Sequence, residues 1–103
     1  PIALITEQVP VVVVANQGHT YEKVVSNVQE VRARGARVIA VATHGDEDIK
    51  HHAEHVLYVP ATSESMAAIP TTIPMQLLSY HIAKLRGCNV DQPRNLAKSV
   101  TVE

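Results

Sequence analysis

The run VPVVVVA, from Val9 to Ala15, is the stretch that decides the fold. It is almost wholly β-branched, a pattern typical of a strand buried on both faces rather than one that alternates between core and solvent. A second run of the same kind, ARVIAVA, covers Ala36 to Ala42. The two runs therefore predict two buried strands.

A helix is predicted between these strands. The apolar residues there recur at i, i+3, i+4, i+7 and i+10, which is one face of a helix: Tyr21, Val24, Val25, Val28 and Val31. Thr20 is a suitable N-cap, and Gly35 stands where the residue after the helix belongs. Strand, helix and strand with short connections form a βαβ unit, which implies parallel strands.

The polar stretch 44–54 follows, and we expect it to hold a short helix starting at Asp46. The segment HVLYVP, from His55 to Pro60, predicts a third strand. A loop rich in small residues, Ser and Thr is expected over 61–68. The fold class is therefore α/β with a parallel sheet.

The longest helix is predicted near the C-terminal end. Pro70 and Pro74 bracket its entry, it runs to about Leu85, and Gly87 ends it. Its apolar stripe is expected to consist of Met75, Leu78, Ile82 and Leu85.

The bulk properties exclude several classes of protein. A chain of 103 residues makes one small domain at most, and a formal charge of −1 is no footprint for nucleic acid or an anionic membrane. The single Cys88 excludes an intrachain disulfide framework and fits a reducing cytosol. No apolar run approaches the roughly 20 residues that span a bilayer. Because the chain starts at Pro1 and a strand follows at once, we expect a piece of a longer protein.

Three stretches of the chain are distinctive: SNVQEVRARG (Ser26 to Gly35), PMQLLSYHIAKLRG (Pro74 to Gly87) and the ending DQPRNLAKSVTVE (Asp91 to Glu103). They resemble the glucosamine-6-phosphate synthase family, the glutamine:fructose-6-phosphate amidotransferases. The resemblance runs over the whole chain. It implies that residues 1–103 are the C-terminal half of the family's last sugar-isomerase (SIS) domain, with 91–103 as a C-terminal active-site tail.

That resemblance also implies a fold and a setting. SIS domains are doubly wound, flavodoxin-like three-layer folds, so a sheet of about three strands would be a partial one, with its first strands and helices upstream of Pro1. The family implies a cytoplasmic enzyme of amino-sugar biosynthesis that forms glucosamine 6-phosphate from fructose 6-phosphate and glutamine. It implies homo-oligomers, a homodimer through SIS domains. We expect no cofactor, no metal, and no nucleic acid or membrane partner.

Lys98 is the first candidate site residue. An ammonium group can bind a sugar phosphate or hydroxyl, or protonate a carbonyl oxygen when its pKa is lowered, although a lone Lys near a terminus is more often solvated. The family resemblance implies that Lys98 lies beside the substrate as a catalytic and binding residue, with the backbone of Ala97 next to the sugar.

Other parts of the family's site lie outside this sequence. In the family, a Ser/Thr-rich loop in the first half of the SIS domain holds the phosphate, and Ser63, Ser65, Thr71 and Thr72 do not match it. The isomerising Glu also precedes this segment, and so does the ring-opening His of the pattern E-x-K-H-G-P, which would end at about Pro1. We therefore expect the isolated chain to be inactive.

Several histidines raise the question of a metal site. His51 and His55 are spaced i, i+4, as metal ligands on a helix can be, but no third ligand is obvious and His55 is expected to begin a strand. A solvated loop is the favoured interpretation. His81 is expected to be structural, either a core residue or part of a subunit interface.

Two further features bear on reactivity and ligand binding. Cys88 follows the expected helix end rather than a helix N-terminus, so no reactive thiolate is predicted. The segment Asn16-Gln17-Gly18, at the carboxyl end of the first strand, is a plausible ligand edge because open α/β sheets bind ligands there.

Two alternatives to the synthase reading stay open. One is a non-catalytic SIS module that binds a sugar phosphate, such as a regulator's effector domain, which fits the βαβ pattern but not the ending DQPRNLAKSVTVE. The other is a purely structural or dimerisation segment with Lys98 solvated.

Overall fold

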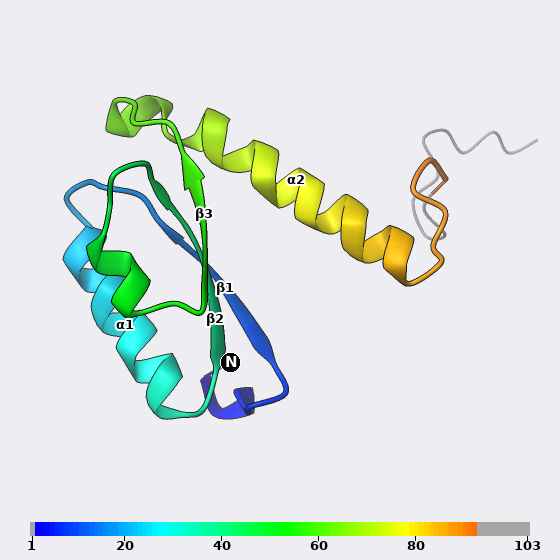
Figure 1. Cartoon of the computed structure of the whole chain (residues 1–103), viewed down its shortest axis with the longest axis horizontal. Coiled ribbons are helices and arrows are strands. Elements are labelled where there is room, and N and C mark those ends of the chain that lie inside the picture. The colour runs from blue at the N-terminus through cyan, green and yellow to red at the C-terminus, as the bar shows by residue number, and fades with distance from the viewer. Residues whose placement is uncertain (1, 93–103) are drawn as a thin grey trace, which may run out of the picture. The chain divides into compact units, whose positions relative to one another are not determined.

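The computed structural model describes residues 2–92. They form two compact parts that meet between Thr72 and Ile73, and each is described by itself. The first part carries a parallel sheet with helices, and the second carries most of the last helix and the turn after it (Figure 1). The candidate residues Ala97 and Lys98 lie outside the described residues.

Three strands form one sheet in the order of the chain: β1 (Pro10–Ala15), β2 (Arg37–Thr43) and β3 (His55–Val59). Both pairings are parallel, with Pro10 opposite Arg37 and Ile39 opposite His55. The predicted α/β class and the parallel βαβ unit are thereby confirmed.

Within residues 2–92 the helices are two α-helices and three short 3-10 helices. In chain order they are η1 (Ile2–Leu4), α1 (Tyr21–Ala33), η2 (Asp48–His51), η3 (Glu64–Met66) and α2 (Ala68–Leu85). No helix within residues 2–92 is both long and apolar enough to cross a bilayer.

Helix α1 begins and ends as predicted. Thr20 is its N-cap residue, although the Thr side chain makes no capping hydrogen bond. Gly35 ends it with a φ of 85°, in the left-handed region that L side chains rarely adopt. The Gly35 amide donates to the carbonyl of Arg32 at 2.8 Å, so the last turn is closed.

The core lies between α1 and one face of the sheet. Ala15, Ala40 and Ala42 are fully buried there together with Ile49 of η2. A second cluster, further along α1, joins three buried residues, Val28, Ala36 and Val38. Small side chains on the strands let helix and sheet approach closely.

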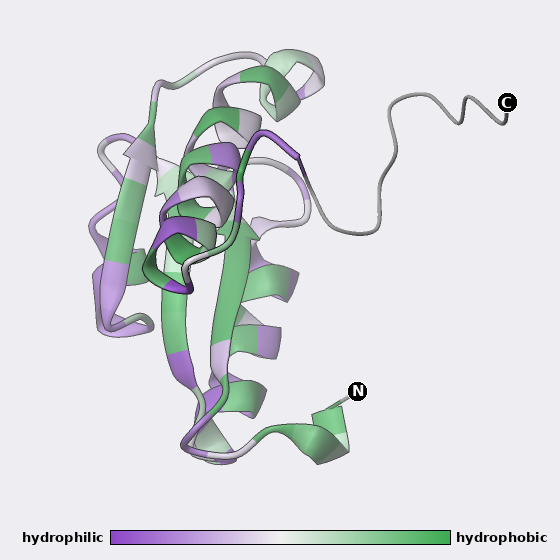
Figure 2. Cartoon of the chain, turned by 90° about the vertical axis from the view of Figure 1, so that its right-hand side faces the viewer, coloured by the Kyte–Doolittle hydropathy of each residue, from purple (hydrophilic) through white to green (hydrophobic). Residues whose placement is uncertain are grey.

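The opposite face of the sheet is partly open, which corrects the prediction that the first strand is buried on both faces. Val12 and Val14 of β1 are 37% and 44% exposed, and Leu57 of β3 is 39% exposed. The reason is that α1 packs against only one face. The strands are hydrophobic along most of their length (Figure 2).

Two helix starts differ from their predictions. The turn after β2 begins at Asp48 rather than Asp46, because the Asp46 carboxylate stands before it and accepts the amides of Asp48 and Ile49. Helix α2 starts at Ala68, ahead of both prolines, so Pro74 lies inside the helix rather than at its entry.

The second part, residues 73–92, leaves much of its apolar surface exposed. Ile73 is 56% exposed, Leu77 53%, and the predicted stripe residues Ile82 and Leu85 are 48% and 88% exposed. Of the predicted apolar stripe, Met75 and Leu78 are therefore partly buried, whereas Ile82 and Leu85 are exposed. Gly87 ends the helix as predicted, with a φ of 68°.

Candidate functional site

The carboxyl edge of the sheet is the part of the described chain where polar side chains gather. β1 ends at Ala15, so the predicted ligand edge Asn16-Gln17-Gly18 does follow that strand directly. β2 ends at Thr43, and Asp46 follows in the next turn. Because the carboxyl ends of parallel strands meet at one edge, these residues share one region.

Asn16 ties this edge to the first turn of α2. Its Nδ2 donates to the hydroxyl of Thr71 at 2.7 Å, and that hydroxyl donates in turn to the carbonyl of Ala67 at 2.6 Å. Thr71 is buried, which makes the contact a fixed one. The Asn16 Oδ1 is also buried but has no hydrogen-bond partner.

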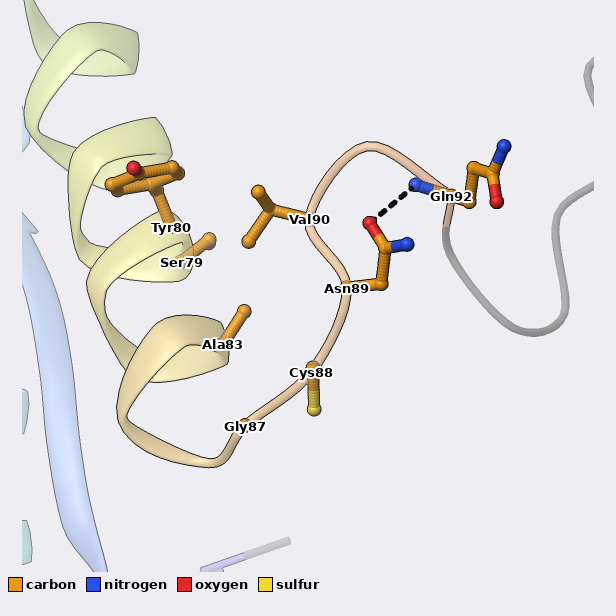
Figure 3. A pocket seen from close by; sticks show the side chains of 8 residues that line it. All are labelled: Ser79, Tyr80, Ala83, Gly87, Cys88, Asn89, Val90 and Gln92. Carbon is orange, nitrogen blue, oxygen red and sulfur yellow. Dashed lines mark hydrogen bonds between the residues drawn. The ribbon is translucent and has the colours of Figure 1, made fainter.

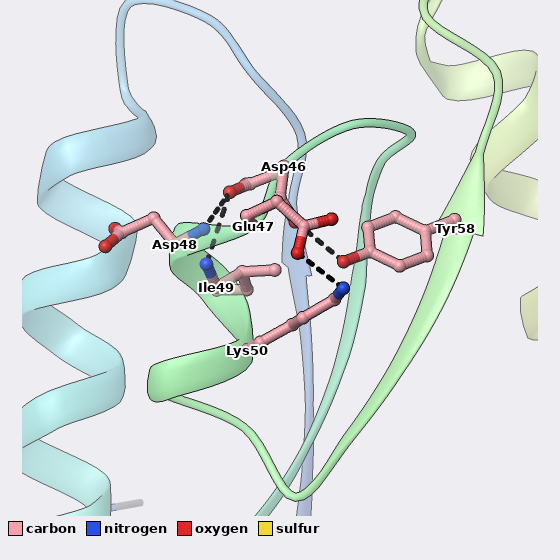
Figure 4. Close-up of polar contacts among 6 residues, drawn as sticks. All are labelled: Asp46, Glu47, Asp48, Ile49, Lys50 and Tyr58. Atoms are coloured by element: carbon pink, nitrogen blue, oxygen red, sulfur yellow. Dashed lines mark hydrogen bonds and ion pairs between the residues drawn. The ribbon is translucent and has the colours of Figure 1, made fainter.

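Asp46 is the centre of the network after β2 (Figure 4). It is only 6% exposed, and its Oδ1 accepts the backbone amides of Asp48 and Ile49 at 3.1 and 3.2 Å. Its Oδ2 accepts the side-chain amide of Gln17 at 3.1 Å. The hydroxyl of Tyr58 donates to the Asp46 carbonyl at 2.6 Å.

Tyr21, the first residue of α1, faces the same carboxylate. Burial, and secondarily the nearby Asp46 carboxylate, raises the pKa of Tyr21 well above its usual value. Its hydroxyl is buried and makes no hydrogen bond. The phenol is therefore held in its neutral form.

Gly18 and His19 meet the connection between β3 and α2. The carboxylate of Glu64, in η3, pairs with His19 Nδ1, and both side chains are more than half exposed. A Cβ at Gly18 would stand only 2.7 Å from the Glu64 Oε1, so a larger residue there would require the exposed Glu64 side chain to shift. The sequence had given no sign of this pair.

The edge residues are thus engaged mostly with one another. The amides of Asn16 and Gln17 bond Thr71 and Asp46, and the Gln17 backbone amide donates to the Thr43 hydroxyl at 2.9 Å. Such a network positions η2 and α2, and it occupies the Asp46 carboxylate with three hydrogen bonds. The ligand edge predicted from sequence is present but is filled by the chain's own side chains.

The serine and threonine residues near η3 are also engaged internally. Ser63 and Ser65 bond each other at 3.2 Å, and the Thr72 hydroxyl donates to the carbonyl of Ala68 at 2.7 Å. That none of them binds a phosphate stays a prediction.

The predicted solvated loop, rather than a metal site, was the interpretation for His51 and His55. His51 ends η2 and His55 begins β3, so the i, i+4 spacing is not on one helix. Across residues 2–92, no three His, Cys, Asp or Glu side chains come close enough together to hold a metal ion. His81 is exposed, and its ring lies edge-on to the Tyr80 ring with 5.4 Å between the ring centroids. The alternative that His81 is a core residue is therefore wrong.

A hollow of about 790 Å³ lies within the second part, between α2 and the turn that follows it (Figure 3). The free thiol of Cys88 is exposed at its rim. The residues that line it are Ser79, Tyr80, Ala83, Gly87, Cys88, Asn89, Val90 and Gln92.

Comparison of the sequence with known protein families shows which family this chain belongs to. The sequence profile of the SIS domain matches residues 1–86, which is most of the chain. The chain belongs to the SIS domain family. The predicted membership is thereby confirmed.

Similar proteins show which SIS proteins this domain resembles. It is 61% identical to a glutamine–fructose-6-phosphate aminotransferase (isomerizing) of Thermus thermophilus and 58% identical to one of Chlorobaculum tepidum. Each match covers all of this chain but 17% of the relative, so the SIS domain chain spans about a sixth of their length.

A solved structure agrees with this picture. The C-terminal domain of glucosamine-fructose-6-phosphate aminotransferase from Francisella tularensis superposes with a TM-score of 0.78 at 36% identity. The superposition covers 89% of this chain and 26% of that one. The SIS domain described here is therefore similar in both sequence and fold to part of that larger domain.

Proposed function

We propose that this SIS domain chain is the C-terminal segment of a glutamine–fructose-6-phosphate aminotransferase (isomerizing) and works as part of that enzyme. The observation that carries the proposal is the similarity to such enzymes over all 103 residues, at 58% and 61% identity. The matches include the ending DQPRNLAKSVTVE, on which the proposed site residues lie.

The proposed reaction has two parts. Ammonia from glutamine is transferred to fructose 6-phosphate, and the ketose imine is then isomerised to the aldose amine, glucosamine 6-phosphate. The isomerisation moves a carbon-bound proton between C1 and C2, so it requires a general base. Because the family resemblance places the isomerising Glu before this segment, we assign that base to a part of the longer enzyme and expect the 103-residue chain alone to be inactive.

In this proposal the last residues of the chain, 91–103, are the tail that completes the sugar site. Lys98 acts as a cation beside the sugar phosphate, able to bind it or to donate a proton to a carbonyl oxygen, and the backbone of Ala97 lies next to the sugar. The partners are a sugar phosphate and further copies of the enzyme. The setting proposed for the whole protein is the cytoplasm.

Replacing Lys98 by Ala in the full-length enzyme tests the assignment. General acid catalysis contributes at least about 100-fold, so we expect a comparable loss in the isomerisation rate while glutamine hydrolysis continues. Lys84→Ala is the matched control, because Lys84 is an exposed lysine of α2 that lies over the Tyr80 ring. If Lys98→Ala leaves amination and isomerisation unchanged, only a structural role for the tail is left.

A further inference from the structure

The hollow between α2 and the turn that follows it is closed at one end by a fixed helix terminus. Gly87 reverses the chain there with its positive φ of 68°. The Gly87 amide donates to the carbonyl of Lys84 at 3.0 Å, and the Cys88 amide donates to the carbonyl of Ala83 at 2.9 Å. This pair of bonds is the Schellman pattern, which ties the turn to the last residues of the helix.

Asn89 fixes the remainder of the turn. Its Oδ1 accepts the backbone amides of Asp91 and Gln92 at 3.0 and 3.1 Å. A short polar side chain that bonds the backbone two residues on is a common way of holding a turn. All these bonds lie within residues 83–92, so both walls of the hollow belong to one compact part of the chain. A ligand would therefore meet a preformed site and have little backbone to order.

The inner wall of the hollow is apolar. Val90 of the turn points toward Tyr80 and Ala83 of the helix, and the three side chains face one another across the space (Figure 3). The Tyr80 ring is 42% exposed, so it offers an aromatic surface to a ligand. Aromatic rings bind flat apolar surfaces well.

The rim of the hollow can both donate and accept hydrogen bonds. The Gln92 side-chain amide offers an oxygen and an NH₂ group, and Asn89 offers its Nδ2 because its Oδ1 already accepts the turn amides. The Ser79 hydroxyl donates to the Met75 carbonyl at 3.0 Å, so its oxygen is left as an acceptor. None of the lining residues is Asp, Glu, Lys, Arg or His, so a charged ligand would lose water there without meeting an opposite charge.

From this combination we propose that the hollow binds an uncharged pyranose sugar, with its C–H face on the Tyr80 ring and its hydroxyls bonded to Asn89 and Gln92. A pyranose has an apolar face bordered by hydroxyls that each donate and accept, which matches an apolar wall with an amide rim. The volume of about 790 Å³ falls within the roughly 300–1,000 Å³ typical of small-molecule sites. The inference does not depend on the proposed function, which concerns a phosphorylated sugar and Lys98.

Titration of the full 103-residue chain, followed by the NMR shifts of its backbone amides, tests the site. The probe is methyl glucopyranoside, and glucose 6-phosphate is its charged counterpart. We expect saturable shifts confined to residues 79–92, a Kd of about 1–10 mM for the glucoside, and binding of the phosphate at least about tenfold weaker. If residues 79–92 show no saturable shift by about 100 mM glucoside, or if both probes bind them equally, the proposal is overturned.

Variants of Tyr80 test the stacking surface. Tyr80→Ala should weaken glucoside binding about tenfold, whereas Tyr80→Phe, which keeps the ring, should bind within about twofold of the parent chain. Gln76→Ala is the control, because Gln76 is an exposed residue of α2 that does not line the hollow. Tyr80→Ala that binds as tightly as the parent chain, or no more weakly than Gln76→Ala, overturns the proposal.

Asn89→Asp tests the rim without removing the turn. The substitution keeps the oxygen that accepts the amides of Asp91 and Gln92 but removes the Nδ2 donors and adds a charge. Glucoside binding should weaken about fivefold or more, while the shifts of the turn amides show that both backbone bonds remain. Undiminished binding by Asn89→Asp with an intact turn contradicts the proposed contact.

Discussion

Asp46 is the residue on which the polar edge of the sheet depends most. Its buried carboxylate accepts three hydrogen bonds, two from backbone amides of η2 and one from Gln17. We expect Asp46→Ala to lower the free energy of unfolding by about 2 kcal/mol, because buried donors are left without an acceptor. Asp46→Asn, which keeps one acceptor oxygen, should lose less.

Urea unfolding monitored by circular dichroism measures both variants of Asp46. The control is Glu47→Ala, since the Glu47 carboxylate is exposed and contacts only Lys50 within this network. A loss in Glu47→Ala as large as that in Asp46→Ala would show that the effect comes from the charge of the turn and not from the buried carboxylate.

Tyr21 makes stability depend on pH at the alkaline end. The folded chain raises the pKa of Tyr21 above its ordinary value of 10.0. Between the two pKa values the unfolded chain has lost the proton and the folded chain retains it, so the stability that is present below pH 10 is lost as pH rises above it. Tyr21→Phe should therefore show a flatter fall in the free energy of unfolding above about pH 10.

Denaturant titrations at pH 8, 9, 10 and 11 test the Tyr21 prediction. Tyr80→Phe serves as the comparison, because Tyr80 lies on the exposed surface of α2. A fall above pH 10 that is equally steep in the parent chain and in Tyr21→Phe would contradict it.

The sequence predicts the role of a single residue well when that role depends only on its neighbours in the chain. Gly35 was assigned correctly, because the end of a helix is encoded within a few neighbouring positions. The partnership of Asp46 with Gln17 was missed, since it joins two loops 29 positions apart and depends on how β1 and β2 pair. A buried-strand pattern followed by Gly-Asp was the only local sign of it.

Two connections between elements contain glycines whose replacement should destabilise the chain by different amounts. Gly35 and Gly45 both have a positive φ, of 85° and 93°. A Cβ at Gly35 would also stand 2.8 Å from the Glu7 Cγ, whereas nothing lies within 4 Å of one at Gly45. Gly45→Ala should cost about 1–2 kcal/mol for backbone strain alone, and Gly35→Ala more.

Thermal unfolding of the two Gly→Ala variants measures that difference. In Gly35→Ala combined with Glu7→Ala, the loss should return to the size seen in Gly45→Ala, because the crowding carbon is gone. A double variant as unstable as Gly35→Ala would mean that the Glu7 side chain moves aside at no cost.

The sequence predicted the elements of the βαβ unit better than it predicted α2. The strand and helix patterns of 9–42 are period-specific and bounded by turn residues, so the sheet and α1 were recovered to within one or two residues. Prolines mislead at α2, because Pro70 fits the first turn of a helix and Pro74 is tolerated inside one. The rule that prolines mark a helix entry therefore placed the start too late.

The open face of the sheet distinguishes the chain from the whole protein proposed to contain it. Val14→Thr puts a hydroxyl on that face, and in the 103-residue chain we expect a change below about 0.5 kcal/mol, as at other partly exposed sites. In the proposed longer enzyme, where we expect a doubly wound sheet to be covered on both faces, it should cost about 1–3 kcal/mol.

Val38→Thr is the control for this comparison, because Val38 is buried against α1 in the chain itself and should be costly in both settings. Chemical denaturation of Val14→Thr and Val38→Thr, each in the 103-residue chain and in the longer enzyme, gives the four changes in the free energy of unfolding. Equal effects of Val14→Thr in the chain and in the enzyme would mean that the face stays open in the enzyme.

At this scale the sequence anticipated an incomplete sheet, because three buried-type strands with few helices cannot cover both faces. It could not anticipate that Glu64, Thr71 and Asp46 fill the carboxyl edge, since their meeting depends on three separate connections. The proposed roles of Ala97 and Lys98 stay predictions, because both residues lie outside the described part of the chain.

The order of the strands has a consequence for how the chain acquires its structure. β1, β2 and β3 lie side by side in the order in which a ribosome makes them, and each pairs with the strand made just before it. No strand has to wait for a later one to be inserted between it and its neighbour. The described strands can therefore pair one after another during synthesis, with α1 covering one face of the first pair before β3 emerges.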